Sequence, residues 1–229
     1  MASAVSSMSL SSAAAPSSRN ISDDEKRWIV IGLILNKTLT TALRQIVRDQ
    51  MVNWHQTLIH PPTNIDKQTF SKHMKTLPPS TLNLNYGSIN NNSTHKLPKS
   101  AFDYSVKDPL SLAKLFVKPF MAGFNAFDHT MDTSAVLSVM CEAEPFIKSG
   151  AHALANKVRA DIRNEWAHCN FCHWTEATFQ TAVADIKALV SKAGFSPLEE
   201  KHVLYDVDGW EKIGKEFFSV TTFYVHIYI

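Results

Sequence analysis

The sequence predicts an all-α protein: a bundle of five to seven helices, built on an antiparallel αα-hairpin and carrying a long irregular insertion. A first observation is the capping-box pattern, serine followed three residues later by glutamate, which starts helices at Ser22 and Ser196. A second is a set of apolar residues spaced by four, as on the buried side of an amphipathic helix: Leu154, Val158, Ile162 and Trp166.

The first long helix is expected to begin after Ser22 and to run to about Leu58. Residues 1–21 are rich in serine and alanine and lack the apolar core of a signal peptide, so we expect a disordered tail. Pro61 and Pro62 end the helix, because proline disfavours helical backbone at the residue before it.

A short helix is predicted over 66–77, followed by a long loop over 78–107. The predicted helix carries Phe70 and Met74 and is stopped by two prolines, Pro78 and Pro79. The loop is rich in asparagine, serine and proline, which favour turns. A loop of this length in one domain is either functional or mobile.

Two helices are predicted between the loop and the central hairpin. Asp108 and Pro109 are typical of a helix start, and the buried side of that helix is expected to hold Leu110, Leu112, Leu115, Phe116 and Phe120. The second helix opens at Asp132 and extends to about Glu144, with Pro145 as its stop.

The hairpin pairs a helix from about Ala151 to His168 with a second helix over 176–192. Trp174 and Phe179 flank the Thr175 N-cap as a hydrophobic staple, and Gly194 suits the position just after the second helix. The corner therefore comprises residues 168–174. Together these elements define a helical domain over 22–194.

Residues 195–229 form a predicted C-terminal extension. A helix begins at Ser196 and Pro197, and Asp208 with Gly209 is expected to break it. The end, residues 220–229, is β-branched and aromatic, which indicates a strand without a partner or an aggregation-prone tail.

Composition narrows the classes of function. The net charge is +2, from 23 basic and 21 acidic residues, which argues against a broad polyanion-binding surface and leaves room for a local basic patch. Only 3 cysteines are present, so a reducing, cytoplasmic location is expected and a disulfide framework is not. No apolar run is long enough for a membrane span.

The end of the central helix carries the candidate site: Arg163, Asn164 and His168. On an ideal helix, Asn164 and His168 share one face, whereas Arg163 and His168 stand roughly 140° apart. Arg163 and His168 can then meet on one ligand only if the helix ends early or a second chain contributes its own copy. In the alternative, purely structural interpretation, Arg163 pairs with a neighbouring helix and His168 caps the helix end.

The Arg-Asn-x-x-x-His sequence at a helix end resembles the RNA-cleavage motif of HEPN domains (higher eukaryotes and prokaryotes nucleotide-binding). With the following Cys169 to Glu176, it is similar to HEPN-like domains of invertebrate proteins, related to that of the DAZ-interacting zinc-finger ubiquitin ligase. The likeness covers about 22–192 and is strongest over 158–190.

This resemblance implies one of two functions. The first is an interaction or RNA-binding module of a regulatory or innate-defence protein, without strong catalysis, whose partner is RNA or a protein. Its RNA-binding residues would be Lys157, Arg159 and Arg163. The second is a metal-independent endoribonuclease acting as a homodimer. There His168 would transfer protons, Arg163 would stabilise the charged phosphorus intermediate and Asn164 would orient the histidine. Neither function requires a cofactor.

Cys169 and Cys172 form a C-x-x-C pair in the hairpin corner. Zinc would need two further ligands, and Cys141 stands alone in the sequence. A redox role would favour a pair at a helix N-terminus, whereas this pair follows a C-terminus. We therefore expect buried or half-buried thiols and no metal.

Overall fold

The computed structural model describes residues 21–70 and 84–219, which form a helical bundle without a β-strand in those ranges. The predicted all-α fold is confirmed. The tail over 1–20, the second part of the predicted 66–77 helix and the apolar end over 220–229 lie outside the described residues.

The first long helix is continuous, as predicted. It comprises α1 (Asp23–Leu33), a π-helical segment η1 (Ile34–Leu39) and α2 (Thr40–Leu58). Both bonds of the Ser22–Glu25 capping box are present, because the Ser22 hydroxyl accepts from the Glu25 N–H and the Glu25 carboxylate accepts from the Ser22 N–H.

The predicted helix over 66–77 is wrong in its described part. Ile65–Lys67 form one 3₁₀ turn (η2), after which Gln68 is extended. The buried Gln68 amide donates to the Tyr86 hydroxyl at 3.1 Å and to the Tyr104 carbonyl at 2.8 Å. These bonds to the following segment fix the chain at Gln68 and override the local helical pattern.

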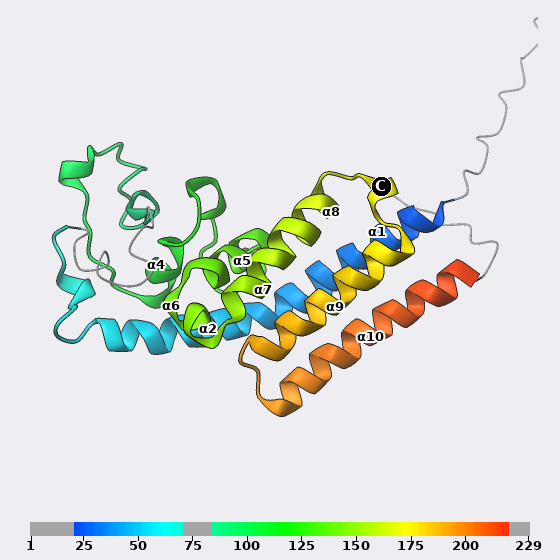
Figure 1. Cartoon of the computed structure of the whole chain (residues 1–229). Coiled ribbons are helices and arrows are strands. Elements are labelled where there is room, and N and C mark those ends of the chain that lie inside the picture. Colours follow the sequence, from blue (N-terminus) through cyan, green and yellow to red (C-terminus); the bar gives the residue numbers. More distant parts are fainter. Residues whose placement is uncertain (1–20, 71–83, 220–229) are drawn as a thin grey trace, which may run out of the picture.

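Residues 84–106 are irregular, as predicted, with 3₁₀ turns at η3 (Tyr86–Ser88) and η4 (Lys99–Ala101). This segment is organised around Asn92, which is fully buried. The Asn92 amide donates to the carbonyls of Tyr86 and Asp103 and accepts from the Asp103 N–H. In Figure 1 the segment lies at the end of the bundle opposite the hairpin corner.

Helix α4 (Pro109–Lys114) begins at its Asp108 N-cap, as predicted. Its expected buried side is correct for Leu112, Leu115 and Phe116, but Phe120 is 81% exposed. The helix stops at Lys114 and Pro119 starts a separate 3₁₀ turn, η5 (Pro119–Met121), so the helical spacing does not continue to Phe120.

Helix α5 (Thr133–Glu142) has the predicted Asp132 N-cap, and the buried side of this helix forms the centre of the core. Pro145 does not act as a helix stop, contrary to our expectation. It lies in the first turn of α6 (Glu144–Ser149), where proline is favoured because no backbone N–H is needed there.

The hairpin is present with the predicted limits. Its first arm consists of α7 (Ala151–Lys157), a second π-helical segment η6 (Val158–Asn164) and α8 (Glu165–Ala167). A 3₁₀ turn, η7 (Phe171–His173), forms the corner, and α9 (Glu176–Lys192) returns from a Thr175 N-cap. Gly194 has a φ of 98°, as expected just after the helix.

Helix α10 (Pro197–Ser219) begins at the predicted Ser196–Glu199 capping box. The predicted break at Asp208 and Gly209 is wrong, because the helix runs through both residues. Val207 is fully buried beneath this stretch, and the Lys187 ammonium of α9 contacts Asp208 at 2.6 Å and Glu211 at 3.0 Å. Packing and ion pairing on both sides of Gly209 thus stabilise a continuous helix.

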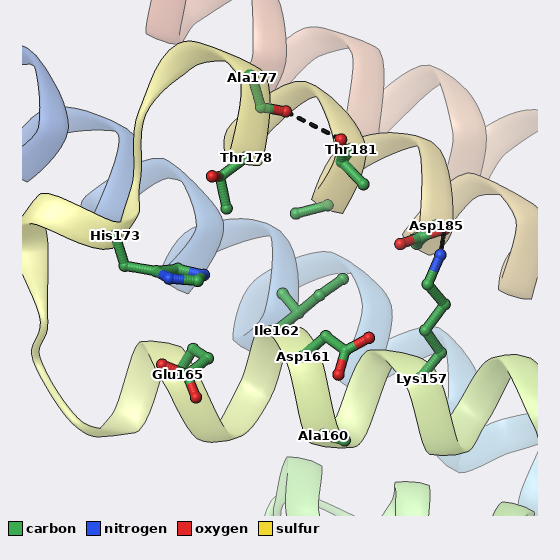
Figure 2. A pocket seen from close by; sticks show the side chains of 11 residues that line it. Lys157, Ala160, Asp161, Ile162, Glu165, His173, Ala177, Thr178, Thr181 and Asp185 are labelled. Carbon is green, nitrogen blue, oxygen red and sulfur yellow. Dashed lines mark hydrogen bonds and ion pairs between the residues drawn. The ribbon is translucent and has the colours of Figure 1, made fainter.

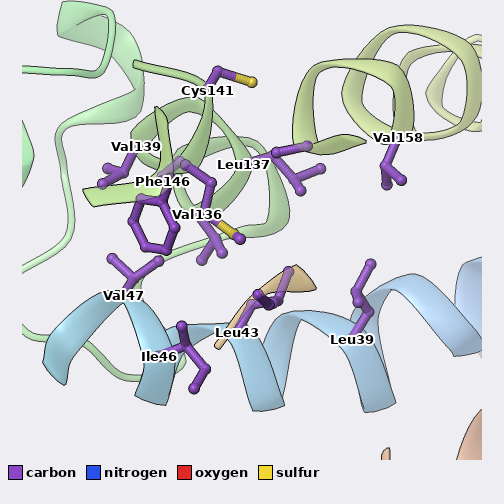
Figure 3. Packing of buried hydrophobic residues seen from close by; sticks show 14 of the residues in the cluster. Leu39, Leu43, Ile46, Val47, Val136, Leu137, Val139, Cys141, Phe146 and Val158 are labelled. Carbon is purple, nitrogen blue, oxygen red and sulfur yellow. The ribbon is translucent and has the colours of Figure 1, made fainter. Parts of the chain in front are cut away.

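The core lies where the long first helix meets the middle of the chain. Leu39, Leu43 and Val47 face Val136, Leu137 and Phe146 from the following helices (Figure 3). Helix α10 packs along α1 and α9, and the Trp210 indole donates to the Thr38 hydroxyl at 3.0 Å (Figure 1). The C-terminal extension therefore packs on the body of the bundle. None of the described helices is both long and apolar enough to cross a bilayer.

Candidate functional site

The candidate motif begins inside the π-helical segment η6 and ends at the hairpin corner. Arg163 and Asn164 are the last residues of η6, and His168 is the C-cap of α8. π-Helical turns are rare and occur frequently at functional sites. The chain contains a second one, η1, in which the Thr40 N–H bonds to the Leu35 carbonyl five residues earlier.

Arg163 lines a hollow of about 220 Å³ between the two π-helical segments and the start of α5. The other lining residues are mostly polar or form the rim of the apolar core: Leu35, Asn36, Asp132, Thr133, Ser134 and Trp166. Asn36 accepts from the Thr133 hydroxyl at 3.1 Å, so a hydrogen-bonded pair joins η1 to α5 at this hollow.

Arg163 is half-buried, and the described part of the chain offers it no carboxylate within ion-pair distance. Its guanidinium donates to the Asn164 amide oxygen at 3.3 Å. The described residues therefore do not form the ion pair that the structural interpretation gives to Arg163, whereas His168 does occupy the helix C-cap that the same interpretation assigns to it.

Asn164 and His168 are not joined by a side-chain hydrogen bond, because Asn164 holds Arg163 instead. The His168 N–H bonds to the Asn164 carbonyl at 3.1 Å, so an ordinary α-turn connects the two ends of the motif. The roughly 140° separation of Arg163 and His168 on an ideal helix consequently persists. His168 is exposed and does not line the hollow of Arg163.

Arg159 lies one turn before Arg163 and faces the same helix, α5. Its guanidinium donates to the Ser138 hydroxyl at 3.4 Å and to the Asn156 amide oxygen at 3.0 Å. Its positive charge lowers the pKa of the Cys141 thiol, but burial is the larger effect and raises that pKa to about 11. Arg159 and Arg163 thus form a short cationic strip along the first half of α5.

Lys157 does not belong to this strip. It lines a separate groove of about 480 Å³ between the central helix and α9, where its ammonium contacts the Asp185 carboxylate at 2.8 Å (Figure 2). The hydrogen bond and the charge of Asp185 raise the pKa of Lys157. Figure 2 also shows Asp161 and Glu165 on the central helix and His173 opposite them. Glu165 therefore faces the groove and not Arg163.

The two corner cysteines are exposed, contrary to our expectation of buried thiols. Cys169 has a φ of 53°, so the chain leaves the helix in a left-handed turn, and Cys172 lies in the 3₁₀ turn η7 that follows. Across residues 21–70 and 84–219, no three histidine, cysteine or acidic side chains converge as metal ligands would.

Sequence reasoning missed the far wall of the hollow. Asp132, Thr133 and Ser134 were identified as a helix start, and Asn36 was assigned no role. The sequence did contain a signal for the two π-helical segments that flank the hollow. Apolar residues spaced strictly by four move about 40° per step around an α-helix, so keeping them on one side favours the wider π-helical turn. Both helices that contain a π-helical segment have this spacing: Ile31, Leu35, Leu39, Leu43, Val47 and Met51 in one, and Leu154 to Trp166 in the other.

The chain matches no known family model, no curated protein and no solved structure.

Proposed function

We propose that the protein is a HEPN-like RNA-binding module without strong catalysis, which contacts RNA phosphates through Arg159 and Arg163. The observation that carries the proposal is that both half-buried arginines lack an ion-pair partner among the described residues while facing one helix. Charged groups that leave water are normally paired, so an unpaired cationic strip favours an anionic ligand.

The chemistry of the hollow supports phosphate in particular. A guanidinium presents a planar fork of donors that matches two phosphate oxygens. The Asn36 and Thr133 side chains add polar groups beside it. Asp132 opposes the anion, since its exposed carboxylate lies at the same hollow. We therefore expect moderate affinity and a few phosphate contacts, in keeping with a net charge of +2.

Binding of single-stranded RNA, followed by fluorescence anisotropy over a range of salt concentrations, tests the proposal. The double variant Arg159→Met/Arg163→Met should bind more weakly. The slope of log K against log salt concentration should also become less steep by about 1.4, which is about 0.7 for each lost phosphate contact. Arg48→Met controls for the loss of an exposed positive charge outside the strip, because Arg48 is exposed on α2 and pairs with Asp49; it removes one charge where the double variant removes two. Equal affinity of the double variant and the control would exclude RNA binding by this strip.

An endoribonuclease is the second candidate, favoured by the position of Arg163 and Asn164 in a π-helical segment and by the exposed His168. Because the hollow of Arg163 does not include His168, the reaction would need the motif of a second chain across a shared groove. His168 would then transfer a proton and Arg163 would stabilise charge on phosphorus.

Cleavage of RNA in the presence of EDTA separates the two candidates. His168→Ala should abolish an EDTA-resistant activity of the wild-type protein if the nuclease interpretation is correct. The substitution leaves the core unchanged because His168 is exposed. Equal cleavage by both proteins would indicate a contaminating nuclease, and absence of cleavage by both would favour the binding module.

A further inference from the structure

Ser134 is a buried polar residue whose hydroxyl lacks a partner in the described chain. It lies in the first turn of α5 and is 6% exposed, and its Oγ has no hydrogen-bond partner within residues 21–70 and 84–219. Buried hydroxyls are nearly always hydrogen-bonded, because losing water without a replacement is costly. Ser134 lines the hollow of Arg163, so a ligand there can supply the missing acceptor.

The hollow also lies at the N-terminus of α5, a helix of 10 residues. The Ala135 N–H donates to the Asp132 carboxylate, and the Val136 N–H makes the first backbone bond of the helix. The N–H groups of Thr133 and Ser134 therefore have no partner within the helix. Such an N-terminus carries a partial positive charge and favours anions.

Arg163 brings a full positive charge to the same hollow from the central helix. Its guanidinium has five N–H donors, and the described chain uses one of them, for the Asn164 amide oxygen at 3.3 Å. Donors from two separate elements therefore lie around one small volume: the Arg163 guanidinium, the Ser134 hydroxyl and the start of α5. This arrangement suits a group with several acceptor oxygens and a negative charge.

The size of the hollow limits which phosphate can enter. Its volume of about 220 Å³ is below the roughly 300–1,000 Å³ of pockets that enclose whole small molecules. An internal phosphate of an RNA strand carries a nucleoside on both sides, whereas a terminal phosphate carries one. The terminal phosphate also has three free oxygens and a charge of about −1.5 to −2 at neutral pH.

We propose that the hollow binds the terminal phosphate of an RNA strand, a phosphate monoester, with Ser134 and Arg163 as its ligands. This inference rests on the proposed RNA-binding function and specifies which phosphate occupies the hollow. Arg159 does not line the hollow and donates to Ser138, one turn further along α5. Arg159 is therefore available to the next phosphate of the same strand.

The Asp132 carboxylate acts against a doubly charged ligand, because it lies at the same hollow. Its charge is screened by water, since Asp132 is exposed, and it accepts the Ala135 N–H at 2.8 Å. Arg163 and the N-terminus of α5 act in the opposite direction. Asp132 therefore lowers the affinity for a terminal phosphate without removing the donors that bind it.

Three single-stranded RNA oligonucleotides of one sequence test the proposal by fluorescence anisotropy with the whole chain. One carries a 5′-phosphate, one a 3′-phosphate, and one has hydroxyl groups at both ends. The wild-type protein should bind at least one phosphorylated oligonucleotide about tenfold more tightly than the third, since charge-assisted hydrogen bonds are among the strong ones. The two phosphorylated oligonucleotides distinguish which end enters the hollow.

Ser134→Ala should reduce this preference to about threefold or less, because a hydrogen bond to the phosphate is lost. Its thermal midpoint should stay unchanged or rise, since the substitution removes a buried hydroxyl that has no partner within the described chain. Ser138→Ala is the matched control, because Ser138 is a buried serine of the same helix that contacts Arg159 and does not line the hollow. Ser138→Ala should keep the preference.

Equal affinity of the wild-type protein for the three oligonucleotides would overturn the proposal. So would a preference that Ser134→Ala leaves unchanged. The hydroxyl-ended oligonucleotide tests the RNA-binding strip separately, through the double variant Arg159→Met/Arg163→Met. Weaker binding by that variant, without a preference for phosphorylated ends in the wild type, would remove this inference and leave the proposed function in place. Failure of the wild type to bind any of the three would overturn both.

Discussion

Trp28 and Trp166 are bonded to each other twice: the indole N–H of each donates to the backbone carbonyl of the other, at 2.8 Å and 3.1 Å. Their rings are stacked with centroids 5.5 Å apart. The pair joins the first helix to the end of the central helix, next to Arg163 in the sequence. It therefore determines where the candidate motif lies relative to η1.

Gly32 is required for this approach, and Gly32→Ala should destabilise the fold. A Cβ at Gly32 would lie 2.7 Å from the Trp166 indole nitrogen, closer than such contacts allow. We expect a loss of about 1–3 kcal/mol in the free energy of unfolding, measured by urea denaturation, although alanine favours helices.

Gly209→Ala is the matched control for Gly32→Ala, since its new methyl group meets nothing within 4 Å. It should stabilise the fold by about 0.5–1 kcal/mol, because alanine is more favourable than glycine inside a helix. Stabilisation by both substitutions would show that Trp166 does not pack closely on Gly32 in solution.

Asn92 should be the most sensitive polar residue of the irregular segment. Asn92→Ala leaves the buried Tyr86 carbonyl and the Asp103 N–H without their partner, and each such group costs about 1–3 kcal/mol when it is unsatisfied, whereas the Asp103 carbonyl still accepts from the Asn90 amide. We expect a loss of at least about 2 kcal/mol in urea denaturation. Asn125→Ala, at an exposed position, should change stability little; similar effects of the two substitutions would contradict the buried network.

The Tyr86 phenol should lose its proton at a higher pH than an ordinary tyrosine does. Burial raises its pKa to about 12, against the smaller lowering effect of the Gln68 hydrogen bond. Because the folded pKa lies above the unfolded one, the stabilising contribution of neutral Tyr86 is complete below about pH 10 and is lost as the pH rises toward 12.

An ultraviolet absorbance titration checks this prediction. Tyr86→Phe should remove one late-titrating phenol from the 5 tyrosines and leave the others unchanged. If the absorbance change lost in Tyr86→Phe falls near pH 10, as for an ordinary phenol, Tyr86 is accessible to solvent and the prediction is wrong.

Asp132→Asn should raise the affinity for RNA if the hollow binds phosphate. Asparagine caps a helix about as well as aspartate, so α5 keeps its start while the hollow loses a negative charge. Interactions between exposed charges are worth about 0.2–1 kcal/mol, which corresponds to a rise of up to about fivefold in anisotropy titrations. Weaker binding by this variant would argue against phosphate at the hollow.

Local signals predicted most helix starts correctly, because a cap is a contact between residues three apart. Asp108, Asp132 and Thr175 each accept the backbone N–H that the sequence assigns to them. Stops were predicted less well. Pro145 was expected to end a helix but lies in the first turn of α6, where no backbone N–H is needed. Gly209 was expected to break a helix but lies inside α10, which is stabilised by its packing on the bundle.

The features of the candidate site also fall into those that the sequence predicts and those that depend on tertiary contacts. The sequence alone determined that Arg163, Asn164 and His168 end a helix at a hairpin corner, since spacing and capping are local properties. Only the tertiary structure decided that Arg163 and Arg159 face α5, that Lys157 turns to Asp185, and that Asn36 and Asp132 share the hollow of Arg163. Those relationships depend on contacts between residues far apart in the chain, whose free energy no local pattern contains.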